Sequence, residues 1–222
     1  IADGFNWAVL NGADVISNSW GGGSSSSTVT NAINSAVSNG VVVLFSSGND
    51  DSSVQYPASL SNVIAVGATS MCDERKSPTS CDGETTWGSN YGSGLDVVAP
   101  GVKIYSSDLT GSAGYASGNY TSAFNGTSSA CPNVAGVVAL MLSAKPSLSV
   151  QQVTDLLEQT TDKAGSYTYS YAYGYPNGTR NNEMGYGRVN AARAVEGAYL
   201  SSVSISGSAC FCSSRSTYSL SN

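Results

Sequence analysis

Three short apolar runs constrain the fold of this chain more than any other feature. Residues 41–45, 62–69 and 95–101 are apolar almost throughout, without the alternation of a strand that has one solvated face. Strands of this kind are buried on both faces, which is typical of a parallel sheet with helices packed on each side. The runs therefore predict central strands of such a sheet.

The other predicted elements are helices and one further strand. In chain order they are the end of a helix at 5–10, a strand at 14–20, and helices at 28–38, from 127 onward, at 150–160 and at 191–200. Ser149 and Gln152 form a capping box for the helix at 150–160, and Asn190 caps the last helix. The alternation predicts an α/β fold with three layers, in which a mainly parallel sheet is flanked by helices.

The composition limits the class of protein. The chain has 222 residues, enough for one large domain, and only 11% of them are charged. A net charge of −6 without any stripe of Lys or Arg argues against a nucleic-acid partner. No apolar run approaches the ~18–20 residues that cross a bilayer, so we expect no membrane span. The chain opens in mid-pattern without Met, so we expect its true N-terminus to be missing.

Five cysteines indicate the redox environment. Cys72 and Cys81 bracket a short polar insertion, which predicts a disulfide that closes a surface loop; the alternative is two unrelated thiols. Cys131 lies in an apolar segment and is expected to be a small buried residue. Cys210 and Cys212 are too close to pair with one another. Without His or a Cys-x-x-Cys pair a zinc site is not expected, and a secreted, periplasmic or cell-surface location fits best.

Two segments stand outside the α/β pattern. Residues 166–182 carry Tyr at every second position from 167 to 175, which predicts a hairpin arm that turns at 176–178 and has one aromatic face. That face either packs on the domain or binds sugar or peptide. Residues 201–222 alternate like β-strands, which predicts either the start of a β-sandwich-like module or a tail.

A Gly-Thr-Ser triplet at 126–128 directly precedes the long apolar helix. A Ser hydroxyl attacks a carbonyl well only if its proton is taken and the resulting oxyanion is stabilised. The free N–H groups and positive dipole end of a helix supply part of that stabilisation beside Ser128. Gly126 permits a sharp turn, and Pro132 is tolerated in the first turn. The alternative is that Thr127 or Ser128 merely caps the helix.

A second candidate follows the apolar strand at 41–45. Gly48 and Asn49 come where that strand ends, and the carboxyl ends of strands build the active site of an α/β sheet. The side-chain amide of Asn49 can there donate a hydrogen bond to an oxyanion. Alternatively, Asn49 is a turn residue that tolerates a positive φ.

Together these residues belong to a series of motifs that closely resembles the subtilisin-like serine proteases. The nucleophile motif of that family is similar to GTSSACPNVAG at 126–136. Further matches, in the family's order, are DVISNSWGG at 14–22, SGN at 47–49, YPA at 56–58, VIAVGA at 63–68, LDVVAPG at 95–101 and GYGRVNA at 185–191. The resemblance covers about 1–198.

The resemblance implies a serine endopeptidase that acts on protein or peptide substrates. Ser128 would be the nucleophile and Asn49 the side-chain donor to the oxyanion, with the Ser128 N–H as its partner. The implied substrate-binding residues are Ser19, Trp20 and Gly21, which would pair with the substrate backbone, and Ser46, Ser47 and Gly48, which would line one wall of the specificity pocket, with Gln55 near its base.

The chain departs from the family in having no histidine. The family's triad runs Asp, His, Ser along the chain, and its first two members lie in segments that precede the first residue here. The resemblance thus implies that 1–200 form the C-terminal part of a catalytic domain whose sheet is incomplete on its N-terminal side. The isolated chain is expected to be inactive and to need an upstream portion of the same protease as its partner.

The amino-acid sequence leaves two other function classes open. A sedolisin-like carboxyl-serine protease would explain a chain without His, but its oxyanion residue is Asp, whereas this chain has Asn49. A non-catalytic pseudoprotease or binding domain is the second alternative. The family resemblance requires no cofactor and allows calcium as a structural ion, bound by Asp96 and the carbonyls near 58–63. Asp96 could equally satisfy local backbone, so no metal ligand is assigned.

Overall fold

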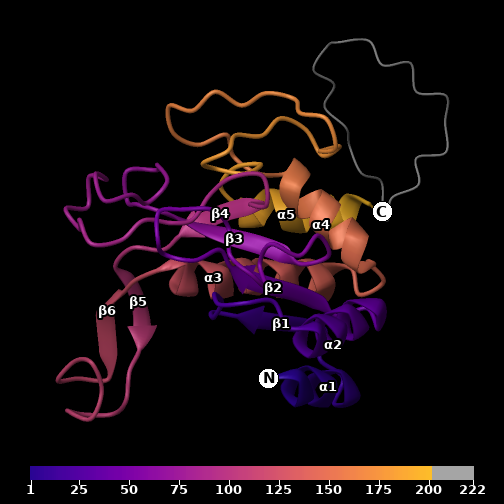
Figure 1. Ribbon diagram of the computed structural model, residues 1–222, viewed down its shortest axis with the longest axis horizontal. Helices are drawn as coiled ribbons and strands as arrows, with labels where there is room; N and C mark the ends of the chain where they lie inside the picture. The colour runs from indigo at the N-terminus through magenta and orange to yellow at the C-terminus, as the bar shows by residue number, and fades with distance from the viewer. Residues whose placement is uncertain (202–222) are drawn as a thin grey trace, which may run out of the picture.

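The computed structural model describes residues 1–201, and its centre is a four-stranded parallel sheet (Figure 1). The strands lie side by side in chain order: β1 (Val15–Asn18), β2 (Val42–Ser46), β3 (Ile64–Thr69) and β4 (Val97–Pro100). All four coincide with predicted strands, and the α/β fold with a parallel sheet between helices is confirmed. The predicted module or tail at 201–222 lies outside the described residues except for Ser201, which caps the last helix.

Each face of the sheet is covered by a separate hydrophobic core, which explains the uninterrupted apolar runs. Along β2, Val42 and Leu44 contribute to one core, while Val43 and Phe45 contribute to the other. The first core includes residues of α3 (Thr127–Ala144), α4 (Val150–Gln159) and α5 (Ala191–Leu200). The second includes residues of α1 (Ala2–Leu10) and α2 (Ser27–Ser38). Both faces of the strand must therefore be apolar.

Helix caps form where the sequence predicts them. At the start of α4, the Ser149 side chain accepts a hydrogen bond from Gln152 N, and the Gln152 side chain accepts one from Ser149 N. At the start of α5, the Asn190 side chain accepts from Arg193 N. These bonds satisfy N–H groups that have no acceptor within the helix, so they fix where each helix begins.

Helix α3 passes under the whole sheet and contacts all four strands. With 18 residues and a mean hydropathy of 1.3, it is also long and apolar enough to cross a membrane by length and composition alone. This differs from the sequence expectation only in the criterion: α3 is no uninterrupted apolar run, but its few polar residues still leave a high mean hydropathy. One such helix is weak evidence for a span, since core helices that pack on a sheet have the same composition.

The structure contains a two-stranded antiparallel ribbon that the sequence did not predict. It consists of β5 (Ile104–Ser107) and β6 (Tyr120–Phe124), and it extends away from the body of the molecule (Figure 1). Tyr105 and Tyr120 are 76% and 66% exposed. Because the ribbon has little contact with the core, it lacks the apolar pattern by which a strand is predicted. The ribbon leads directly into the Gly-Thr-Ser triplet.

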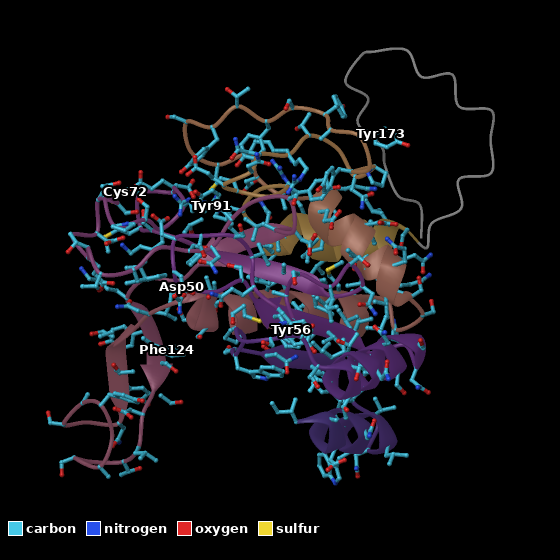
Figure 2. The ribbon with its side chains drawn as sticks, in the orientation of Figure 1. Asp50, Tyr56, Cys72, Tyr91, Phe124 and Tyr173 are labelled. Atoms are coloured by element: carbon cyan, nitrogen blue, oxygen red, sulfur yellow. A yellow bond between two sulfur atoms is a disulfide. The ribbon has the colours of Figure 1, made fainter. Side chains whose placement is uncertain are left out.

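The Tyr-rich arm at 166–182 differs from the predicted hairpin. It is closed by one antiparallel bridge, between Ser170 and Arg180, and contains no strand. The predicted single aromatic face is also wrong. Tyr167 and Tyr169 pack on a small apolar cluster, Tyr173 is fully exposed (Figure 2), and the Tyr175 ring lies under the Arg180 guanidinium. Regular alternation fails because these contacts hold successive rings in different surroundings.

Glu158 joins α4 to the Tyr-rich arm and is nearly fully buried. Its Oε2 accepts a hydrogen bond from Asn177 Nδ2 at 2.8 Å. Burial raises the pKa of Glu158 from its ordinary value of 4.5 to about 7, and the nearby charges of Asp96 and Asp155 act in the same direction. The folded chain therefore holds a proton here that the unfolded chain releases at lower pH.

This raised pKa predicts a specific pH dependence of stability. The contribution of Glu158 is full below about pH 4.5 and is lost as the pH rises to about 7, at a cost of roughly 3 kcal/mol. We expect Glu158→Gln to abolish the decline between pH 6 and 7, measured by urea unfolding. Between pH 4.5 and 6 the decline should become shallower but not disappear, because burial also raises the pKa of Asp96, to about 6. A variant with the same profile as the wild type would contradict this assignment.

Candidate active site

The end of β2 and the start of α3 meet at one place, where three hydrogen bonds join them. Asn49 Oδ1 accepts from both the backbone N and the Oγ1 of Thr127, each at 2.9 Å. Thr127 Oγ1 in turn accepts from Gly48 N at 3.3 Å. Thr127 is fully buried. The Gly-Thr-Ser triplet and the Gly-Asn pair, 78 residues apart in sequence, are thus held together.

These bonds also decide where the Asn49 amide points. Thr127 N is a donor, so the atom facing it must be Oδ1, and Nδ2 is turned to the other side of the amide. A Cβ placed on Gly126 would lie 3.3 Å from Asn49 Nδ2 and 3.4 Å from Ser128 N. Within residues 1–201, neither donor has a hydrogen-bond acceptor. Two free N–H donors therefore border one small space beside Ser128.

Gly126 keeps this space open. Its φ is +113°, in the region that favours glycine, and it occupies the N-cap position of α3. Any side chain here would both strain the backbone and project between the two donors. Glycine is therefore required at position 126 both for its positive φ and because it leaves the space between the two donors empty.

Ser128 lies in the first turn of α3 and is half-buried, so solvent reaches it. Its Oγ donates to the carbonyl oxygen of Ser19 at 3.2 Å, and Ser19 Oγ donates to the carbonyl oxygen of Ser128 at 2.7 Å. Ser19, Trp20 and Gly21 follow β1 and are exposed. The structure therefore brings the predicted substrate-binding strand next to the predicted nucleophile.

Gly48, one of the residues predicted to form the pocket wall, lies beside the Gln55 side chain. Ser46 and Ser47 are buried, and Ser47 Oγ donates to Asn90 O at 3.1 Å. A Cβ atom added to Gly48 would lie 3.1 Å from Gln55 Oε1, and one added to Gly22 would lie 3.3 Å from it. Gln55 thus lies between these two glycines. A cavity of about 900 Å³ lies elsewhere, between α4, the loop at 59–63 and the Tyr-rich arm.

Sequence reasoning missed Asn90, a fully buried residue that holds the loop around Asn49. Its Oδ1 accepts from Asp50 N at 2.9 Å and Ser52 N at 3.1 Å, and its Nδ2 donates to Ser47 O at 3.2 Å. One side chain therefore binds the backbone on both sides of Asn49. The SNYG sequence at 89–92 gives no local signal for this role, since every partner is about 40 residues away.

Asp96 is engaged with the backbone, as the second interpretation of this residue expected. Its Oδ2 accepts from Ala65 N at 2.7 Å. This bond accounts for one carboxylate oxygen, and no set of metal ligands is assigned from it.

Cys72, Glu74 and Cys81 lie close enough together to hold a metal, but the two cysteines form the predicted disulfide. Cys131 is a buried free thiol, as predicted.

Comparisons with known proteins identify the family of this chain. The family model described as Subtilase family matches residues 1–187. The chain is 41% identical to Subtilisin DY of Bacillus licheniformis over 174 residues, which are 76% of this chain and 57% of that protein. It is 42% identical to Subtilisin BL of Lederbergia lenta over 178 residues, or 80% and 59% of the two chains. The chain thus spans less than two thirds of these relatives.

Solved structures show the same similarity. The chain resembles a protease of Pseudoalteromonas arctica with a TM-score of 0.69 and 34% identity, covering 89% of this chain and 57% of that one. It also resembles fervidolysin from Fervidobacterium pennivorans with a TM-score of 0.67 and 33% identity, covering 88% and 28%. Both matches include most of this chain.

Proposed function

Because the chain belongs to the subtilase family of serine peptidases, we propose that it forms the C-terminal part of the catalytic domain of a serine endopeptidase. The observation that carries this proposal is the convergence of Asn49 Nδ2 and Ser128 N on one space beside the Ser128 hydroxyl. Such a pair of donors stabilises the oxyanion that forms when a hydroxyl attacks a peptide carbonyl.

In the proposed mechanism, Ser128 Oγ attacks the substrate carbonyl while its proton passes to a base. The C–N bond of the peptide then breaks, the amine leaves with that proton, and the acyl-enzyme ester that remains is hydrolysed by water. The carbonyl oxygen becomes an oxyanion that accepts hydrogen bonds from Asn49 Nδ2 and Ser128 N. The main chain of Ser19–Gly21 pairs with the substrate backbone as an added strand and aligns the scissile bond. Ser46, Ser47 and Gly48 form one wall of the pocket that binds the substrate side chain just before the scissile bond. No cofactor takes part in these steps.

The attack by Ser128 requires a base that accepts its proton. The Ser128 hydroxyl donates to the Ser19 carbonyl, which is not a base, and the chain has no His. We therefore propose that an upstream portion of the same protease supplies the base and that 1–222 alone are inactive. Without a base, the oxyanion donors could retain roughly 10³–10⁴-fold of rate enhancement at best.

The unpaired edge of the sheet supports an upstream partner. β1 is the first strand in the sheet order, so its outer edge has no strand neighbour within residues 1–201. Trp7 and Leu10 on α1 are 68% and 84% exposed, and Leu140 on α3 is 55% exposed. Upstream strands that pair with β1 would cover this edge and remove a template for aggregation. The disulfide fits a secreted, periplasmic or cell-surface location.

A fluorophosphonate probe, which labels an activated serine, tests the proposal. We expect no labelling of 1–222 alone and labelling of Ser128 when the upstream portion is present in the same chain or as a second polypeptide. Ser128→Ala in the complete protein is the control and should not be labelled.

The other outcomes separate the alternatives. Labelling of Ser128 in the isolated chain would contradict the need for an upstream base. A complete, folded protein that is not labelled would favour a non-catalytic pseudoprotease. Activity restricted to about pH 4 would favour the sedolisin-like mechanism, which Asn49 at the oxyanion position argues against.

A further inference from the structure

The loop that carries Asn49 is held by a second segment, 88–91, and includes a strained residue. Asp51 N donates to Gly88 O at 2.9 Å, and Gly88 N donates to Asn49 O at 3.4 Å. Asp51 has a φ of +52°, in the left-handed region that residues other than glycine rarely adopt. Such a conformation persists only where surrounding contacts impose it. The position of Asn49 therefore depends on what holds Asp51.

Arg75 holds Asp51 from a distant part of the sequence. Its Nη1 donates to Asp51 Oδ1 at 2.5 Å and to Ser89 O at 2.9 Å, so one nitrogen joins the Asn49 loop to segment 88–91. Its Nε donates to Glu183 Oε2 at 2.9 Å, and the guanidinium lies 4.4 Å from the centre of the Tyr91 ring. The side chain is 9% exposed. Arg75 is thus fixed on several sides.

The backbone of Arg75 is equally well anchored. It lies in the loop closed by the Cys72–Cys81 disulfide, and this loop, Tyr91 and Asp50 lie on the same side of the molecule (Figure 2). The next residue, Lys76, donates from its N to Ala68 O at 2.8 Å and accepts at its carbonyl from Ser89 N at 2.7 Å. The loop is therefore attached both to β3 and to the segment that supports Asn49.

We propose that Arg75 is a positioning residue for the oxyanion donor Asn49, acting through Asp51. The inference rests on the proposed function. Arg75 does not touch substrate. It fixes the carboxylate and backbone of Asp51, and it offsets the negative charge of Asp51, which lies two residues from Asn49, the donor that must face an oxyanion. Loss of Arg75 frees Asp51 to leave its strained conformation, which displaces Asn49 Nδ2. Because that donor acts on the transition state, the loss appears in kcat rather than KM.

The test uses the complete protease in a double-mutant cycle. We expect Arg75→Gln to lower kcat by roughly 10- to 100-fold with little change in KM, since small displacements of a catalytic group cost rates of this order. In an Asn49→Ala background, Arg75→Gln should lower kcat no further, because the donor that it positions is already gone. A purely structural role would reduce kcat equally in both backgrounds, and that result would overturn the proposal.

Two further variants keep the test decisive. Asp51→Asn keeps the shape of the Arg75 partner but removes its charge. It should also lower kcat, and it should have no effect on kcat in the Asn49→Ala background. Asp51→Asn therefore tests the proposal even if Arg75→Gln fails to fold. Arg193→Gln is the control, since Arg193 pairs with Asp162 and contacts neither the Asn49 loop nor the Cys72–Cys81 loop that carries Arg75; its kcat should stay unchanged. A normal kcat in folded Arg75→Gln and Asp51→Asn overturns the inference. Failure of the wild type to label at Ser128 would instead refute the proposed function itself.

Discussion

Replacing Asn49 with Ala in the complete protease is expected to lower kcat by about 10²–10³-fold and to leave KM nearly unchanged, a range known for the side-chain oxyanion donor of a subtilisin. The physical reason is that Asn49 Nδ2 faces the space beside Ser128 rather than a protein acceptor. The hydrogen bond forms fully only when the substrate oxygen becomes negative. Steady-state kinetics on a peptide substrate measures both constants.

The same substitution has a structural cost that must be separated from the catalytic one. Removing Asn49 Oδ1 leaves the buried N–H and hydroxyl of Thr127 without their acceptor, which costs about 1–3 kcal/mol of stability for an unpaired buried group. Asn49→Asp makes the separation, because it keeps an oxygen for Thr127 and replaces the Nδ2 donor by a second oxygen. We expect its kcat to fall at least as far as that of Asn49→Ala.

A suitable control is Asn62→Ala. Asn62 Nδ2 donates to Asn34 Oδ1 in an exposed position, so its loss should leave kcat unaltered. If Asn49→Ala and Asn49→Asp both kept wild-type kcat, Asn49 could not be the oxyanion donor, and the proposed reading of the site would fail.

The parts of the fold that the sequence predicts are those decided by local burial. Each run of apolar residues that became β2, β3 or β4 is buried on two faces, so its identity depends little on its partner strand. The β5–β6 ribbon was missed because its strands are largely exposed. The Tyr-rich arm shows the reverse failure. Its period of two is a strand pattern, yet Tyr175 donates its hydroxyl hydrogen to Ser93 O and stacks with Arg180 instead of forming a ladder.

The same distinction holds at the site. Ser128 and Asn49 were predicted because each stands at the end of a recognisable element, and β2 and α3 necessarily meet where the sheet contacts its core helix. Asn90 and Arg75 were not predicted because their roles consist of contacts with distant segments: Asn90 binds residues 38–43 positions away, and Arg75 binds Asp51 and Glu183 at separations of 24 and 108. No local pattern encodes such contacts.

The largest expected effect on stability concerns Lys76 and Asp82, a pair of side chains with no solvent exposure. Lys76 Nζ lies 3.2 Å from Asp82 Oδ1 and donates to the carbonyl oxygens of Ser77 at 2.7 Å and Glu84 at 2.6 Å. Asp82 Oδ1 also accepts from Glu84 N at 2.8 Å, whereas Asp82 Oδ2 has no hydrogen-bond partner among residues 1–201. Lys76 is therefore the principal group that compensates the buried charge of Asp82.

Lys76→Met should accordingly lower the free energy of unfolding by about 3–5 kcal/mol, because it leaves Asp82 buried without an opposite charge. Urea unfolding at neutral pH measures this loss. The double variant Lys76→Met/Asp82→Asn should recover much of it, since the penalty arises from the uncompensated charge and not from the lost Lys side chain. Lys145→Met, at a half-exposed position after α3, should change stability by less than about 0.5 kcal/mol. If the single and double variants were equally stable, Asp82 would not be the source of the penalty. The lost stability would then come from the Lys76 contacts with Ser77, Glu84 and the Trp87 ring.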